Sequence, residues 1–184
     1  MCIRDSIDAA GRSGNASLHV NGIDPGFAND VLPLSMTSLS QRIDEVRCLE
    51  IADYSTYYQP VVMSSIFGFG QPMETTPMLF TPGVLSMAWG PVVRQIAAGL
   101  DLTLDEPLVE RVDRVAADRD YSTVSVEIPE GTMAAVRFEV AGQVDGVDRV
   151  VLEHITRTHP DQCPQWPTPC LLYTSDAADD SLRV

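Results

Sequence analysis

The 184-residue chain carries a formal net charge of −14 and contains no lysine. Nucleic acids and anionic membranes bind basic surfaces, so this charge argues against both as partners. Because lysine is missing, Schiff-base catalysis by a lysine of this chain is excluded. No apolar run reaches the length of about 18 residues that a membrane-spanning helix needs.

The two ends of the chain read like translations of one short DNA element in opposite orientations. The reverse complement of the DNA that encodes residues 1–6, read in another frame, encodes Cys170–Ser175, and its continuation would encode residues 176–180. The element resembles a sequencing adapter. We therefore expect residues 1–6 and 170–184 to be adapter artefacts, and residues 7–169 to be a gene fragment with sequence missing on both sides.

The first natural residues lead into a tight turn. Residues 7–16 are rich in Gly, Ser, Asn and Ala, which predicts a loop or the frayed end of a helix. A short apolar run, Ser17–Val20, then precedes the turn Asn21–Phe27. Pro25 fixes φ and Gly26 permits a φ that other residues avoid, so this backbone can approach a ligand closely. An ordinary turn is the alternative, because Pro-Gly is a common turn dipeptide.

A helix and a strand are expected after this turn. The helix spans Asn29–Ser40, with Asn29 or Asp30 as its cap and Pro33 in its first turn. The strand spans Arg42–Ala52 and delivers three tyrosines within five positions, at 54, 57 and 58. Each tyrosine combines a large apolar face with a hydroxyl, so a pocket wall is predicted there, with core packing as the alternative.

The longest helix is expected over Val84–Leu100, after a short helix over Val61–Phe67 and a proline-rich connection. One apolar stripe runs along the long helix and includes Trp89. Trp89 is therefore either a core residue or a ligand contact. A strand over Leu108–Ala116 is expected next, although its periodicity also permits a helix.

A hairpin closes the natural sequence. Its strands are expected over Gly131–Ala141 and Val147–Thr158, with Gly142–Gly146 as the loop. One face of the first strand carries Ala134, Val136, Phe138 and Val140, and one face of the second carries Val150, Leu152, His154 and Thr156. His154 is either a hydrogen-bonded histidine at a sheet edge or a ligand contact.

Familiar catalytic motifs are missing from the sequence. There is no Gly-x-Ser-x-Gly, no Gly-x-Gly-x-x-Gly, no His-x-x-x-His and no clustering of carboxylates, so acyl transfer, dinucleotide binding by that fingerprint and metal ligation are not indicated. Cys48 and Cys163 are far apart and form no Cys-x-x-Cys, which leaves a reducing cytoplasm as the default location. A pocket of aromatic side chains with a few polar tips remains.

Four runs of sequence resemble one enzyme family. Gly22–Pro33, Asp53–Tyr57, Thr81–Gly83 and Glu153–Arg157 together are similar to the C-terminal domain of the 2,4-diaminopentanoate dehydrogenase and native amine dehydrogenase family, which is dihydrodipicolinate reductase-like. The resemblance implies an α+β domain, 17–169, that is an open mixed β-sheet with helices packed on one face. It also implies an N-terminal dinucleotide-binding domain that holds NAD or NADP, of which residues 7–16 would be a remnant.

The resemblance also implies roles for particular residues. This domain would bind a small amine or diamine and supply the contacts of a homo-oligomer, expected as a dimer, while the catalytic acidic residue would lie in the N-terminal domain. Contacts to the cofactor are expected from Asn21, Gly22, Asp24, Pro25, Gly26 and Phe27. Contacts to the substrate are expected from Tyr54, Thr56, Tyr57, Phe69, Trp89 and His154, with Tyr54, Tyr57, Phe69 and Trp89 forming an aromatic cage.

Two other functions remain open. The first is a dihydrodipicolinate reductase-like imine reductase, although a lysine-free chain lacks the proton-donor motif of true dihydrodipicolinate reductases and offers few cations, such as Arg157, to bind a carboxylate. The second is a non-catalytic α+β domain that binds a ligand or a partner through its sheet.

Overall fold

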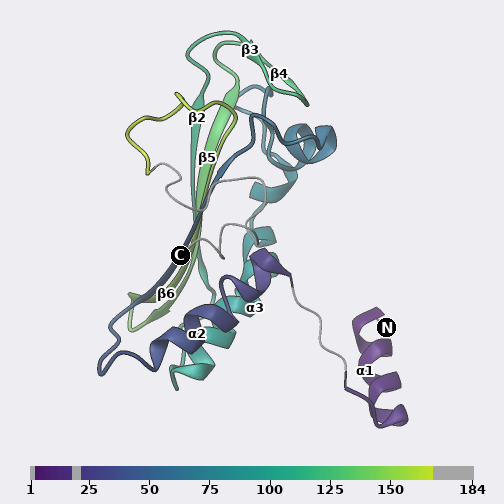
Figure 1. Cartoon of the computed structure of the whole chain (residues 1–184), viewed down its shortest axis with the longest axis vertical. Helices are drawn as coiled ribbons and strands as arrows, with labels where there is room; N and C mark the ends of the chain where they lie inside the picture. The colour runs from purple at the N-terminus through teal and green to yellow at the C-terminus, as the bar shows by residue number, and fades with distance from the viewer. Residues whose placement is uncertain (1–2, 18–21, 168–184) are drawn as a thin grey trace, which may run out of the picture.

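The computed structural model describes residues 3–17 and 22–167 (Figure 1). The run at 18–20, Asn21 and the expected adapter residues 170–184 lie outside these ranges. Helix α1, Ile3–Gly14, lies apart from the other elements in Figure 1. It covers most of residues 7–16, which agrees with the predicted helix end and not with a loop. No described helix is long and apolar enough to cross a membrane.

A four-stranded sheet forms the centre of the fold. Its strand order is β1-β6-β5-β2, with β1 parallel to β6 and the other two pairs antiparallel, so the sheet is mixed and open. A separate two-stranded sheet pairs β3 with β4. The strands are β1 Val46–Asp53, β2 Val109–Ala116, β3 Tyr121–Ser122, β4 Glu127–Ile128, β5 Met133–Val144 and β6 Val147–Arg157.

Two helices lie on one side of the large sheet (Figure 1). Helix α3, Val84–Gly99, packs on the strands, and α2, Val31–Thr37, packs against α3. The core between α3 and the sheet is made of aliphatic and aromatic side chains with almost no exposed surface, among them Leu85, Val93, Ile96, Val136, Phe138, Val140, Val150 and Leu152. The predicted α+β class, an open mixed sheet with helices on one face, is confirmed.

Local sequence explains most element boundaries. Asp30 caps α2 through its side chain, which accepts a hydrogen bond from the backbone N–H of Val31, and Pro33 lies in the first turn as predicted. The helix ends at Thr37, three residues earlier than expected from the sequence. β1 begins at Val46 rather than Arg42, because pairing with β6 starts there.

The β5–β6 hairpin turns more tightly than predicted. Only Asp145 and Gly146 separate the strands, with φ of 53° and 75°. Asp-Gly is well suited to a two-residue turn that needs positive φ at both positions. Gly142 and Gln143, expected in the loop, therefore pair with β6 across a register shift.

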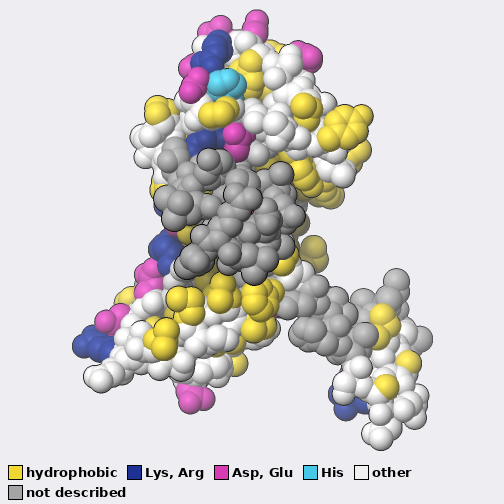
Figure 2. Space-filling model, viewed as in Figure 1, with side chains coloured by type: hydrophobic (Ala, Val, Ile, Leu, Met, Phe, Trp, Pro, Cys, Tyr) yellow, Lys and Arg dark blue, Asp and Glu magenta, His cyan; other side chains and the backbone are white. Residues whose placement is uncertain are grey.

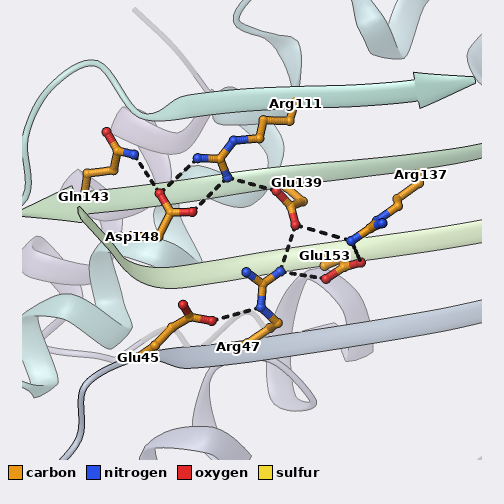
Figure 3. Close-up of polar contacts among 8 residues, drawn as sticks. All are labelled: Glu45, Arg47, Arg111, Arg137, Glu139, Gln143, Asp148 and Glu153. Carbon is orange, nitrogen blue, oxygen red and sulfur yellow. Dashed lines mark hydrogen bonds and ion pairs between the residues drawn. The ribbon is translucent and has the colours of Figure 1, made fainter. Parts of the chain in front are cut away.

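The sheet face opposite the helices carries a network of ion pairs that crosses all four strands (Figure 3). Glu153 in the middle strand pairs with Arg47 and Arg137 at 2.7 Å each, and its side chain is only 5% exposed. Arg111 joins Glu139 to Asp148 at 2.9 Å. This face is therefore held by charge pairs, whereas the helix-covered face is held by apolar packing.

Candidate functional site

The turn Ile23–Phe27 has the unusual backbone that its Pro-Gly pair predicts. Pro25 has φ of −67° and ψ of 138°, and Gly26 has φ of 152° and ψ of −135°, a region that side-chain-bearing residues rarely enter. The amide of Phe27 donates to the carbonyl of Gly22 at 2.7 Å. The amide of the buried Gly26 donates to Oδ1 of Asn29 at 2.8 Å. The turn is thus closed on itself and tied to the residues just before α2.

This turn fixes the position of Asp24. Oδ1 of Asp24 accepts hydrogen bonds from Asn29 Nδ2 at 2.5 Å and from Trp89 Nε1 at 2.7 Å. The Trp89 ring packs edge-on against Phe138, with centroids 5.0 Å apart. The ring of Trp89 thus packs on a core residue, as one of the two alternatives predicted, while its N–H points at Asp24; a ligand contact stays a prediction.

The parallel pairing of β1 and β6 brings two more polar side chains to Asp24. Glu50 and His154 are register partners on these strands. Nε2 of His154 lies 3.5 Å from Oε2 of Glu50. Ligand atoms of Asp24, Glu50 and His154 all lie within 4.8 Å of one another. We call these three residues the acidic cluster.

The histidine of the cluster is held firmly in the sheet. Its ring stacks on Phe138 with centroids 4.9 Å apart and an interplanar angle of 9°. Its Nδ1 shares a hydrogen bond with Thr156 Oγ1 at 2.9 Å. β6 lies between β1 and β5, so the expected position at a sheet edge is wrong, while the expected hydrogen bond is present.

The acidic cluster lies in an open cavity of about 1160 Å³. Apolar side chains make up much of the lining, including Ile23, Leu32, Trp89, Phe138 and Leu152. Figure 2 shows hydrophobic side chains gathered on the part of the molecule where Figure 1 places α2. The exposed residues there include Leu32 and Met36, which line the cavity and are 44% and 57% exposed.

The two carboxyl groups of the cluster have opposite protonation preferences. Burial, a hydrogen bond to Asp24 and the Asp24 charge raise the pKa of Glu50 to about 9, although 42% of its side-chain surface remains exposed. Burial alone would raise the pKa of Asp24, but hydrogen bonds from Glu50 and Trp89 outweigh it and lower that pKa. At neutral pH the pair therefore holds one proton, on Glu50, and one negative charge, on Asp24.

The third member of the cluster is uncharged at neutral pH. Burial lowers the pKa of His154 to about 4, against the opposing effect of the Asp24 charge. The cluster as a whole is thus an anion of single charge inside a partly apolar cavity. Such a site attracts cations, and it can take up or release a proton at Glu50.

The structure brings together three of the residues predicted from the sequence to form a site. Asp24, Trp89 and His154 all line the cavity. Tyr54 and Tyr57 stack on each other with centroids 4.5 Å apart but do not line it, and Thr56 is exposed in the loop beside them.

The expected aromatic cage does not form as one unit. Phe69 is 1% exposed and stacks on Phe67 in the core, so it is not placed on the cavity wall. Tyr54 follows Glu50 by four residues, which is roughly 13 Å along a strand. Phe67 contacts the rings of both Tyr54 and His154. Burial and the charges of Glu50 and Asp24 raise the pKa of Tyr54, so Tyr54 lies near the cluster without lining the cavity.

Several residues of the site were not predicted from the sequence. The statement that carboxylates are not clustered was wrong, because Asp24 and Glu50 lie together. Alternation places Glu50 on one face of β1, but the sequence does not reveal that β1 pairs in parallel with β6. Asn29 carried a visible signal, since an amide just before a helix is well placed to bind the preceding turn.

Most of the residues expected to contact a cofactor are exposed on the turn, whereas Gly26 is buried. Of Gly22, Asp24, Pro25, Gly26 and Phe27, only Asp24 lines the cavity, and Asn21 lies outside the described residues. The side chains of Ile23 and Phe27 are nevertheless 67% and 47% exposed. This turn thus exposes apolar surface beside the cavity, with Ile23 as part of the lining, which suits a flat aromatic ring. The cofactor contacts stay predictions.

Two known proteins are similar in sequence to this chain. The chain is 44% identical over 182 residues to an amine dehydrogenase of Streptomyces virginiae, covering 98% of this chain and 49% of the relative. This chain is related to the amine dehydrogenases. It is also 22% identical over 158 residues to a 2,4-diaminopentanoate dehydrogenase of Acetoanaerobium sticklandii, covering 85% of this chain and 44% of the relative. No family model matches the chain.

The amine dehydrogenase relationship extends to the fold. The structure of an amine dehydrogenase from Mycobacterium smegmatis aligns with a TM-score of 0.56 at 11% identity, covering 73% of this chain and 40% of that one. The resemblance predicted from the four sequence runs is confirmed. The chain spans about half the length of the curated relatives that it matches.

Proposed function

We propose that this chain is the substrate-binding and oligomerisation domain of an NAD(P)-dependent oxidoreductase that acts on the CH–NH2 group of amines or diamines. The observation that carries the proposal is the acidic cluster in a partly apolar cavity, in a chain 44% identical to an amine dehydrogenase. An anionic site suits the ammonium group of the substrate. The apolar lining suits its carbon skeleton.

Each part of the cavity has a task in this proposal. Asp24 is held in one orientation by Trp89 and Asn29, so its charge is placed before the substrate arrives. Trp89 and Phe138 supply apolar surface beside it and help to exclude water.

The nicotinamide supplies the hydride chemistry when it is bound. The turn Gly22–Phe27 fits an expected position beneath that ring, because Ile23 lines the cavity and both Ile23 and Phe27 expose apolar surface. In the proposal, an N-terminal dinucleotide-binding domain holds the rest of the cofactor and supplies the catalytic acidic residue. The chain alone is then inactive.

The ion-paired face of the sheet is the proposed surface for contacts between subunits (Figure 3). Glu153 and Glu139 are each paired with arginines. Burying this face against a second subunit would therefore remove few unpaired charges from water. We expect a homo-oligomer, and a dimer as its smallest form.

An imine reductase for dicarboxylic substrates fits the cavity less well. The fixed charge of Asp24 repels a carboxylate, and no described arginine forms an ion pair with Asp24 or Glu50. A non-catalytic binding domain is the remaining alternative. Amine turnover by the complete protein would exclude it.

The test is amine-dependent reduction of NAD+ or NADP+ by the complete protein encoded by the gene that contains this sequence. With small primary amines or diamines, the absorbance of the reduced nicotinamide should increase over time. The 184-residue chain alone should give no such increase. An intact gene without a glycine-rich dinucleotide-binding region, or no turnover with any such amine, would count against the proposal.

A further inference from the structure

The acidic cluster has no cationic side chain to balance it. The sequence has no lysine, and within residues 22–167 neither Asp24 nor Glu50 forms an ion pair with an arginine. His154 is the basic group recorded beside them, and burial lowers its pKa to about 4. Two carboxyl groups thus face each other with only a shared proton to separate their charges.

The buried histidine points its Nε2 at this pair. The His154 side chain is 7% exposed, and its Nδ1 is engaged by Thr156 Oγ1. Its Nε2 has Glu50 Oε2 as its recorded neighbour at 3.5 Å, at the outer limit for a hydrogen bond. The ring is therefore aimed into the cluster with one polar atom not engaged by an ordinary hydrogen bond.

We propose that Asp24, Glu50 and His154 form a binding site for an ammonium group, and that Glu50 gives up its proton when this group enters. The N–H groups of the ligand would then bridge the two carboxylates and Nε2 of His154, in place of the proton. The step balances as Glu50–COOH plus R–NH3+ giving the Glu50–COO−/R–NH3+ pair plus one proton released to the buffer. This inference rests on the proposed function for the natural identity of R, an alkyl chain in the cavity.

An ammonium group fits the site better than a divalent metal ion. Oδ1 of Asp24 already accepts hydrogen bonds from Trp89 and Asn29, which reduces its capacity to ligate a metal. An ammonium nitrogen needs only hydrogen-bond acceptors arranged around it, and its carbon chain gains from the apolar lining. The experiment must therefore distinguish ammonium binding from metal binding.

The site should bind cations better as pH rises. The titratable groups of the cluster are Asp24, Glu50 and His154, and the titratable groups near it are Tyr54 and Cys48. Burial raises the pKa of Cys48 to about 11, and burial also raises that of Tyr54, so neither competes for protons near the pKa of Glu50, about 9. Below that value the ligand must displace a proton. Above it the site is already empty of protons.

Calorimetric titration of the 184-residue chain with methylammonium chloride tests the proposal. Tetramethylammonium chloride at equal ionic strength is the control ligand, since it carries the same charge without N–H groups. We expect about tenfold tighter binding of methylammonium. In buffers of different ionisation enthalpy, close to one proton should be released per ligand at about pH 7, well below the Glu50 pKa of about 9.

Matched variants assign this binding to the cluster. Asp24→Asn and Glu50→Gln should each weaken methylammonium binding by about tenfold or more, and Glu50→Gln should abolish proton release. Asp113→Asn and Glu130→Gln, which change exposed carboxylates outside the cavity lining, should leave both unchanged. Carbon-13 NMR titration of the wild-type chain tests the same site without any substitution. Saturating methylammonium should lower the pKa of one glutamate carboxyl by about one unit or more.

Three results would overturn the proposal. They are equal binding of the two organic cations, methylammonium binding that survives both cluster variants, and tight binding of zinc chloride with no methylammonium binding. The test also separates the site from the wider function. Amine oxidation by the complete protein without methylammonium binding at the cluster would refute the site alone. Binding at the cluster without amine oxidation would refute the dehydrogenase function alone.

Discussion

At the scale of single residues, the indole N–H of Trp89 is the contact that links α3 to the acidic cluster. It donates to Asp24 at 2.7 Å, while the ring packs on Phe138. Trp89→Phe keeps an aromatic ring there but removes the donor. We expect the Michaelis constant for the amine to rise about tenfold in the complete protein, because a hydrogen bond to a charged group is lost.

The matched control is Trp166→Phe, which changes the other tryptophan of the chain, in a loop away from the cavity lining. It should leave the Michaelis constant unchanged, and both variants should keep the wild-type melting temperature within a few degrees. A Trp89→Phe protein with unaltered kinetics would show that the bond to Asp24 has no part in amine binding.

Glu50 should make the protein less stable as pH rises. Its pKa in the fold, about 9, lies above the value for an unfolded chain, so between about pH 4.5 and pH 9 the folded state holds a proton that the unfolded state has lost. Stability from this group is then present at low pH and is lost as pH increases through that window. Glu50→Gln cannot lose a proton there, so it should gain stability over the wild type as pH rises.

Urea denaturation of the two proteins at about pH 5 and about pH 8.5 measures this difference. The free energy of unfolding of Glu50→Gln minus that of wild type should be larger at the higher pH. Glu130→Gln serves as the control with no such trend, because Glu130 is exposed. A difference that is independent of pH would mean that Glu50 ionises normally.

At the scale of elements, the turn before α2 sets the geometry of the cluster. Gly26 has φ of 152° and is buried, so a side chain there is strained. Gly26→Ala should lower the free energy of unfolding by about 1–3 kcal/mol and weaken amine binding, because Asp24 lies two residues away.

Gly14→Ala is the comparison for this substitution. No atom lies within 4 Å of the position of an added Cβ at Gly14, and its φ is not positive. Chemical denaturation should therefore show no loss in Gly14→Ala. Equal stability of the two variants would contradict a strained turn.

The ion pairs of the open sheet face should matter most where they are buried. Glu153 is 5% exposed and pairs with two arginines, whereas Glu45 is 40% exposed and pairs with Arg47 alone. Glu153→Gln should lower the free energy of unfolding by about 1–3 kcal/mol, because charged hydrogen bonds of a buried group are lost. Glu45→Gln should cost about 0–1 kcal/mol, as exposed pairs do. Reversed effects in thermal denaturation would contradict this order.

The periodicity of apolar residues determined which elements and site residues could be predicted from the sequence alone. Alternation correctly assigned Phe138 and His154 to the apolar faces of the hairpin strands, and the apolar stripe correctly located α3. It could not show that β1 lies parallel to β6, because that pairing joins residues about 100 positions apart. For this reason Glu50 was missed. Phe69 was misplaced because an aromatic residue in a glycine-rich loop looks the same whether it is buried or lines a pocket.

At the scale of the whole molecule, the cavity opens where apolar surface of α2 and the preceding turn is exposed. Phe27, Leu32 and Met36 are each more than 40% exposed on this side. In the proposed enzyme this surface faces the N-terminal domain, so that the cofactor ring and the acidic cluster close on one substrate. The sequence supplied the resemblance that predicts this arrangement, while the structure supplied the cluster.

The central claim is that Asp24 binds the amine of a dehydrogenase substrate. Its most direct test is the rate of NAD(P)+ reduction by the complete protein with a panel of small primary amines and diamines, for wild type, Asp24→Asn and the surface control Asp113→Asn. We expect amine-dependent reduction by wild type and the control, and a kcat/KM lowered by about tenfold or more in Asp24→Asn. An Asp24→Asn enzyme as active as wild type would contradict it.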